Sequence, residues 1–151
     1  MNQVILDLQL ACKNRLGIPN QKKFHQWVTT TLVPFQRQKS EVTVRLIDEE
    51  ESCRINFRYR GKEKPTNVLS FPYNLPFNIP LIGDLLICKQ VVEYESLKQQ
   101  KSLEAHWAHM TIHGTLHLMG CNHIKKDDAE EMEKVEKNIM LNLGYPDPYN
   151  I

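Results

Sequence analysis

Three histidines in one short stretch have the spacing of a metal site. His113, His117 and His123 follow the pattern H-x3-H-x5-H, with Gly120 between the second and the third. On a helix, residues four apart project from the same face, so His113 and His117 can bind one ion. A left-handed conformation at Gly120 would end the helix and return His123 to that ion. Three imidazoles with a fourth position left to water are typical of catalytic zinc, so we expect one Zn²⁺ per chain.

A fourth histidine and a cysteine offer other ligand sets. His109 lies four residues before His113 and would extend the histidine row along the helix. The ends of that row, at His109 and His117, would stand about 12 Å apart along the axis at about 1.5 Å per residue, too far for one tetrahedral ion. We therefore interpret His109 as a residue that supports the ligands or faces the substrate. Cys121 lies within the returning segment, where His123 already supplies the ligand.

The histidine spacing also matches the long zinc signature of metzincin proteases, H-E-x-x-H-x-x-G-x-x-H, with one departure. The glutamate that serves those enzymes as general base is replaced by Gly114. A metal-bound water, with its pKa lowered to about 7, remains available as a nucleophile, but another group must handle the proton and the developing charge. The pattern favours a hydrolase of another kind, and a peptidase-like hydrolase is the weaker alternative.

Composition and length place the chain among ordinary globular proteins. Its 151 residues, 41% hydrophobic and 25% charged, suit a single domain over residues 1–151 with a proper core. The formal net charge is +1, so nucleic-acid binding would depend on local basic clusters. Four cysteines without CxxC pairs, and no signal-peptide pattern, predict a reducing cytoplasmic location. No apolar run approaches the roughly 18 residues that span a bilayer, so we expect no membrane contact.

Hydrophobic periodicity predicts an α+β fold. Alternating or short apolar runs predict strands over 3–10, 41–48, 68–72 and 81–88, the last buried on both faces. Helical periodicity predicts helices over 21–35, 49–59, 89–98 and 103–119, and a final helix that begins at a cap on Asp127 or Asp128. The apolar stripe of that final helix is predicted to comprise Met132, Val135, Ile139 and Leu143. The result is an α/β sandwich with a four-stranded mixed sheet, five helices and a zincin-like helix that carries the histidines.

A basic segment follows the second predicted helix. Asp48 is a good N-cap for that helix, and arginines gather in its last turns, where cations also stabilise a helix C-terminus. Gly61 is expected to end the helix before a loop that leads into strand 68–72. Asp84 lies near the start of an apolar strand. Such a carboxylate must be hydrogen-bonded, be paired with a charge, or lie at the open end of the strand. The residues expected to contact substrate are Arg60, Lys62, Lys64, Thr66, Asn67 and Asp84. Arg54 would join this path for phosphates, and a merely solvated basic face is the alternative.

Two separated stretches resemble the YbeY family of metal-dependent endoribonucleases. They are NFRYRGKEKPTNVLSFP over 56–72 and HGTLHLMGCNH over 113–123, and the Gly83-Asp84 pair and the length agree with the family. The resemblance implies a single-strand-specific RNase that matures the 3′ end of 16S rRNA and acts in ribosome quality control. It implies RNA and the small ribosomal subunit as partners, with no DNA expected. It also implies His113, His117 and His123 as metal ligands and Arg58 as the functional arginine.

The chemistry of phosphodiester cleavage agrees with this resemblance. Zinc can polarise the phosphate or supply hydroxide, and Arg58 can hold a phosphate with its planar fork of donors. Alternatively the RNA 2′-hydroxyl attacks, and His109 or metal-bound hydroxide takes its proton. The sequence leaves both routes open. It also leaves open a non-catalytic ribosome-assembly factor in which the metal only stabilises the fold.

Overall fold

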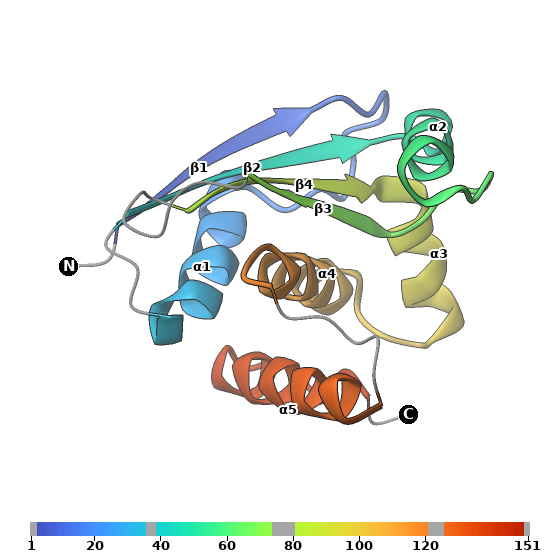
Figure 1. Ribbon diagram of the computed structural model, residues 1–151. Helices are drawn as coiled ribbons and strands as arrows, with labels where there is room; N and C mark the ends of the chain where they lie inside the picture. The colour runs from blue at the N-terminus through green and yellow to red at the C-terminus, as the bar shows by residue number, and fades with distance from the viewer. Residues whose placement is uncertain (1–2, 36–38, 74–80, 121–125, 150–151) are drawn as a thin grey trace.

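The structure is a computed structural model that describes residues 3–35, 39–73, 81–120 and 126–149. Four strands and five α-helices lie within these ranges, together with one short 3₁₀ helix (Figure 1). In chain order they are β1 (Gln3–Leu10), α1 (Gln21–Leu32), η1 (Val33–Phe35), β2 (Lys39–Ile47), α2 (Glu49–Arg60), β3 (Val68–Pro72), β4 (Leu81–Cys88), α3 (Lys89–Lys98), α4 (Leu103–Leu118) and α5 (Lys126–Asn142). The predicted α+β fold class, with its four-stranded mixed sheet and five helices, is confirmed.

The strands form one mixed sheet in the order β1-β2-β4-β3. β1 pairs with β2 and β2 pairs with β4 in parallel, whereas β3 pairs with β4 antiparallel. Asp84 of β4 therefore lies between Thr43 of β2 and Phe71 of β3. β3 is an edge strand, so the segment that follows the basic loop lies at the rim of the sheet.

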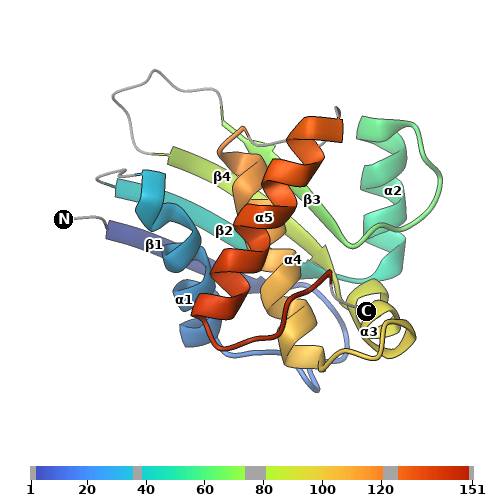
Figure 2. The same cartoon turned by 90° about the horizontal axis from the view of Figure 1, so that it is seen from below.

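The helices are distributed unequally over the two faces of the sheet. α1 and α4 lie against the lower face in Figure 1, α3 lies beside α4 below the end of the sheet at which β4 ends, and α5 packs beneath α4, as the view from below also shows (Figure 2). α2 lies at the other side, beside one end of the sheet. The helix that carries His113 and His117 is thus enclosed between the sheet and α5.

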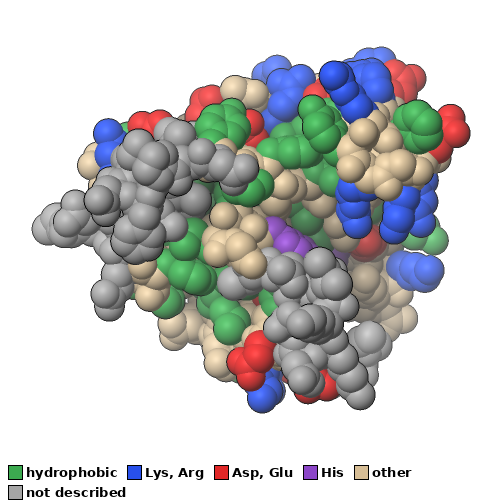
Figure 3. Space-filling model, in the orientation of Figure 1, with side chains coloured by type: hydrophobic (Ala, Val, Ile, Leu, Met, Phe, Trp, Pro, Cys, Tyr) green, Lys and Arg blue, Asp and Glu red, His purple; other side chains and the backbone are tan. Residues whose placement is uncertain are grey.

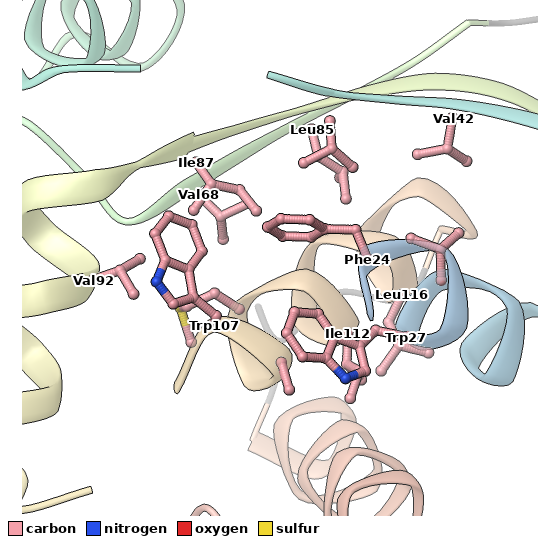
Figure 4. Packing of buried hydrophobic residues seen from close by; sticks show 14 of the residues in the cluster. Phe24, Trp27, Val42, Val68, Leu85, Ile87, Val92, Trp107, Ile112 and Leu116 are labelled. Carbon is pink, nitrogen blue, oxygen red and sulfur yellow. The ribbon is translucent and has the colours of Figure 1, made fainter. Parts of the chain in front are cut away.

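Aromatic side chains fix α4 against the sheet. Phe24 packs edge-to-face on Trp27 and on Trp107, with ring centroids 5.3 Å and 6.0 Å apart, and all three side chains are fully buried. Figure 4 shows Phe24 and Trp107 between the sheet residues and the helix residue Ile112. Edge-to-face pairs add about 0.5–1.5 kcal/mol beyond the area they bury, so α4 has a well-determined position.

The strand β4 is covered on one face only. Leu85 and Ile87 point toward α4 and are fully buried, whereas Asp84 and Leu86 alternate with them and are half-buried. The prediction that this strand is buried on both faces is wrong. The face of the sheet opposite α4 is incompletely covered. Among the described helices only α2 lies on that side, and it lies beside one end of the sheet.

Several predicted helix ends differ from the observed ones. Gly61, with φ 71°, ends α2 in the left-handed conformation as expected. Asp48 occupies the N-cap position without capping the helix, because its carboxylate accepts from the Lys13 amide at 3.0 Å and from Gln90 Nε2 at 2.7 Å. α5 already begins at Lys126, so the predicted caps at 127 or 128 lie inside the helix. α1 gives way to the 3₁₀ turn at residue 33, leaving Phe35 37% exposed.

The buried face of α5 is not the predicted apolar stripe. Val135 is 40% exposed, and the fully buried position beside it is Glu136. Met132, Ile139 and Met140 are the other buried residues in the part of this helix whose side chains are described, 129–142. A carboxylate therefore points from α5 toward the histidine face of α4.

Candidate metal centre

The two helical histidines meet at the distance expected for ligands of one ion. α4 begins at Ser102, whose hydroxyl accepts from the Ala105 amide at 3.1 Å, and it ends before Gly120, which has φ 89°. Nε2 of His113 and Nε2 of His117 lie 3.1 Å apart. Two nitrogens bound to one tetrahedral zinc at about 2.05 Å would stand about 3.3 Å apart. This pair of imidazoles fits a zinc ion.

Glu136 orients the first of these histidines. Nδ1 of His113 donates to Glu136 Oε1 at 2.7 Å, which assigns the proton to Nδ1 and leaves Nε2 unprotonated. A ligating histidine ordinarily donates its other ring nitrogen to a carboxylate or carbonyl in this way. The Nε2 lone pair of His113 therefore faces His117, as a metal ligand requires.

The Glu136 carboxylate is itself surrounded by donors. It accepts from His109 Nε2 at 2.6 Å and from the Tyr149 hydroxyl as well as from His113, and its side chain is buried. Burial raises the pKa of this carboxyl, but the hydrogen bonds from His109 and His113 outweigh burial and lower the pKa to about 2. Glu136 is thus a buried anion held by three donors, and it would favour a cation close by.

His109 lies behind the candidate ligands. His109 is 5% exposed, and burial lowers its pKa more than the nearby Glu136 raises it. A neutral His109 ring that donates its Nε2 proton to Glu136 agrees with both the burial and the lowered pKa. The structure therefore places His109 on the carboxylate, and it is absent from the described lining of the cavity beside His113 and His117.

A cavity of about 420 Å³ opens beside the two histidines. Its walls come from the end of α2, the following loop, β3 and α4. The lining residues are Arg60, Thr66, Asn67, Val68, Leu69, Ser70, His113 and His117. In Figure 3 a histidine surface is visible near the centre of the molecular face, with Lys and Arg side chains gathered above and to its right. The cavity brings one arginine to the candidate metal ligands.

Hydrogen bonds from α2 and α3 hold the loop that forms one wall. Ser52 Oγ donates to the Thr66 carbonyl and accepts from the Thr66 amide, both at 3.0 Å, and Asn56 Nδ2 donates to the Lys64 carbonyl at 2.8 Å. Asn67 donates to Glu95 at 3.3 Å and accepts from the Val68 amide at 2.6 Å. The polar atoms of Asn67 are used within the fold, so this residue shapes the wall.

The remaining predicted substrate residues are divided between two places. Lys62 and Lys64 are exposed on the loop. Arg58 and Asp84 line a second cavity, which shares no lining residue with the histidine cavity. Arg60 is the arginine among the described residues that line the histidine cavity, whereas the role expected of Arg58 at the metal stays a prediction.

Gly114 is the point of closest approach between α4 and the sheet. A Cβ atom here would lie 2.9 Å from Val68 Cγ2 and 3.0 Å from Leu85 Cδ2. The Ser70 hydroxyl also donates to the Gly114 carbonyl at 2.9 Å. The glycine lets the histidine helix rest on β3 and β4, and this packing leaves no room for the glutamate of the protease signature.

The third predicted ligand, His123, lies outside the described residues, as does Cys121. Within the ranges that the structure describes, no group of three or more His, Cys, Asp or Glu side chains is placed to hold a metal. The described residues thus contribute two candidate ligands and the buried carboxylate that orients one of them.

Sequence reasoning overlooked Glu136, the residue that organises the site. The sequence held one indication of its burial. Glu136 lies four residues after Met132 and three before Ile139, so it is an acidic residue on an otherwise apolar helix face. A charged residue on such a face is buried only with partners, and the histidines of α4 supply them.

A family model described as Endoribonuclease YbeY matches residues 11–144. The chain belongs to the YbeY family. Its members are endoribonucleases by that description, so the chain belongs to a family of RNA hydrolases. The resemblance predicted from the two sequence stretches is confirmed.

A solved structure has the same fold. The solution structure of TM1509 from Thermotoga maritima matches with a TM-score of 0.58 and 21% identity, over 95% of this chain and 99% of that one. At this identity the likeness supports the fold alone. In the described part of the chain, no helix has the length and apolar character needed to cross a bilayer.

Proposed function

We propose that this YbeY-family chain is a single-strand-specific, zinc-dependent endoribonuclease that cleaves RNA at the cavity beside His113 and His117. Its proposed role is the maturation of the 16S rRNA 3′ end and ribosome quality control in the cytoplasm, on the small ribosomal subunit. The observation that carries the proposal is the pair of Nε2 atoms 3.1 Å apart, in a cavity that also contains Arg60. His123 is the proposed third ligand.

Each described residue has a distinct part in the proposed reaction. Arg60 holds the scissile phosphate with parallel N–H donors, which a guanidinium provides better than an ammonium does. His113 and His117 bring their Nε2 atoms together at the cavity, and Glu136 fixes the ring of His113. Zinc, when bound, supplies Lewis acidity at the phosphate and an acidified water.

We assign to Arg60 the phosphate-binding role that the family resemblance had implied for Arg58. The two residues are two positions apart on α2, which corresponds to a rotation of about 200° around the helix axis. Only Arg60 lines the cavity of the histidines, and Arg58 lines the other one. Holding a phosphate at the histidines requires a side chain on the Arg60 side of the helix.

His109 is assigned to positioning. Its Nε2 faces Glu136 at 2.6 Å and its ring is almost fully buried, so proton exchange with a substrate in the cavity is disfavoured. Both nucleophiles named above, water and the 2′-hydroxyl, remain compatible with the other residues. An RNA with a single 2′-deoxy residue at the cut site separates the two, because only the 2′-hydroxyl route stops there.

The proposal is tested by the cleavage of a labelled single-stranded RNA. Arg60→Ala should lose at least about 100-fold in kcat/KM while it keeps its zinc and its circular dichroism, because removal of one charge-stabilising donor costs about that much. Arg15→Ala removes another exposed arginine, which lines neither cavity, and serves as the matched control. Equal cleavage by these two variants would refute the role of Arg60.

The same assay addresses the two alternatives. A non-catalytic assembly factor predicts that purified wild-type protein shows no cleavage, and that loss of a ligand histidine unfolds the protein or abolishes ribosome binding. A peptidase-like hydrolase predicts chelator-sensitive cleavage of casein. The close packing at Gly114 disfavours the second alternative, since the glutamate base of the protease signature has no room there.

A further inference from the structure

The second cavity lies on the face of the sheet opposite the histidines. It has a volume of about 580 Å³ and is lined by Arg45, Arg54, Ile55, Arg58, Tyr59, Phe71, Asp84 and Leu86. The strand residues in this set alternate with the residues that face α4, so the cavity occupies the incompletely covered side of β2, β4 and β3. Nothing in the proposed reaction uses this cavity.

One wall of the second cavity is an open aromatic surface. The rings of Tyr59 and Phe71 meet edge-to-face with centroids 5.1 Å apart. Tyr59 is 63% exposed, and the Arg58 guanidinium carbon lies 5.8 Å from the centre of its ring. An exposed aromatic ring beside an arginine is the arrangement on which single-stranded nucleic acids stack their bases.

The charges of the cavity are suited to an anionic ligand. Arg45 is neutralised by Glu51, with Nε to Oε2 at 2.9 Å. Within the described residues, neither Arg54 nor Arg58 makes an ion pair. Two guanidinium groups are therefore available to phosphates at the mouth of the cavity.

A carboxylate occupies the opposite wall. Asp84 accepts from the Tyr73 hydroxyl at 3.0 Å and has the cavity in front of it. A carboxylate repels phosphate but accepts from the amino and imino groups on the edge of a nucleobase. The cavity thus offers a stacking surface, two cations and an acceptor, which together match one nucleotide.

We propose that this cavity is a second RNA subsite, which binds a nucleotide of the same single strand at a distance from the cut. The base stacks on Tyr59, its edge faces Asp84, and Arg54 and Arg58 hold the adjoining phosphates. The inference rests on the proposed function, because it assigns the cavity to the substrate of the histidine site.

The two cavities lie back to back around the edge strand. On α2 the successive residues Tyr59 and Arg60 line different cavities, and on β3 the successive residues Ser70 and Phe71 do the same. Since β3 is the edge of the sheet, a strand can pass from one cavity to the other around this edge and the end of α2. In Figure 3 hydrophobic and basic side chains lie above the visible histidine, on the same molecular face. Such a path requires an unpaired strand, because a duplex cannot wrap a single β-strand so closely.

The test compares Tyr59→Ala with a closely matched control. Tyr94 on α3 is also 63% exposed and has Lys98 Nζ 5.9 Å from the centre of its ring, but it lines neither cavity. Steady-state cleavage by the full zinc-loaded protein is measured on a long single-stranded RNA and on a trinucleotide. Binding is measured separately with a 2′-O-methyl phosphorothioate strand, which resists cleavage.

With the long RNA, Tyr59→Ala should raise KM and weaken binding about tenfold while kcat is unchanged, because one base loses its stacking partner. Tyr59→Trp should restore both values. Tyr94→Ala should match wild type, and the trinucleotide should be cut equally by all four proteins.

Two outcomes separate the failure of this inference from the failure of the proposed function. If wild type cuts the long RNA but Tyr59→Ala has the same KM and affinity, the second cavity is not an RNA subsite, and a protein partner becomes the occupant to seek. If wild type cuts neither substrate, the proposed function itself fails. An equal loss on the trinucleotide would also overturn the inference, because the effect would then come from the histidine cavity.

Discussion

Glu136→Gln is the substitution that most sharply tests the arrangement behind the histidines. The carboxylate accepts from two imidazoles and one hydroxyl, whereas a carboxamide has one acceptor oxygen and turns an NH₂ group toward donors. At least one N–H of His109 or His113 would lose its partner or face another donor. A buried donor without a partner costs about 1–3 kcal/mol.

The lowered pKa of Glu136 gives a second estimate of the magnitude. A fall from 4.5 to about 2 corresponds to about 3 kcal/mol in favour of the ionised form in the folded protein. We expect the free energy of unfolding of the metal-free Glu136→Gln variant to fall by about 3 kcal/mol at neutral pH. Its zinc affinity should fall about 10- to 100-fold, because His113 loses the carboxylate that orients it.

Urea unfolding and competition with a chromophoric chelator measure the two effects. Glu131→Gln, on the exposed side of the same helix, is the matched control and should change stability by less than about 0.5 kcal/mol. The reasoning is refuted if Glu136→Gln unfolds at the same urea concentration as Glu131→Gln and binds zinc equally well.

Three further predictions concern other parts of the molecule. Gly114→Ala should lower stability by about 1–3 kcal/mol in urea unfolding, despite alanine's better helix propensity, because its methyl group would press on Val68 at 2.9 Å; unchanged stability would show that α4 can move freely. Burial raises the pKa of the Glu95 carboxyl, but the hydrogen bonds from His106 and Asn67, together with the neighbouring imidazoles, outweigh it and the pKa is lowered, so this group's stabilisation is complete above pH 4.5 and is lost as the pH falls below that value. Glu95→Gln should therefore flatten the acid limb of a plot of stability against pH, and an unaltered limb would contradict the assignment. Cytosine oligomers should bind more tightly than uracil oligomers, and Asp84→Ala should remove the part of this preference that depends on the cytosine amino group; a preference that survives the substitution would exclude that contact.

The histidine pair and the glycines that follow α2 and α4 could be predicted because their signals are local. An i, i+4 spacing places His113 and His117 on one helix face whatever else the chain does, and Gly61 and Gly120 occur where a left-handed residue is needed. The structure then supplied the distance between the two imidazoles, which spacing alone leaves undetermined.

Glu136 could not be assigned from the sequence, because the buried face of α5 depends on how that helix docks on α4. Apolar periodicity favoured Val135, which is exposed, over the neighbouring glutamate. The burial of this carboxylate becomes understandable only when the histidines of α4 lie opposite it. A pairwise contact between distant segments carries no local signal.

The choice between Arg58 and Arg60 depended on tertiary structure in the same way. Both lie in the last turn of α2, and residues two apart on a helix point in nearly opposite directions. The docking of α2 beside the edge strand decides which of them faces the histidines. The same docking creates the second cavity, which no periodicity in the sequence indicates.

The most direct test of the metal-dependent nuclease is the titration of zinc into metal-free protein while RNA cleavage is followed. The account predicts that the cleavage rate rises with bound zinc and reaches a plateau at one ion per chain, and that His113→Ala and His123→Ala show no such rise. A cleavage rate that does not depend on bound zinc, or that persists in both histidine variants, would contradict it.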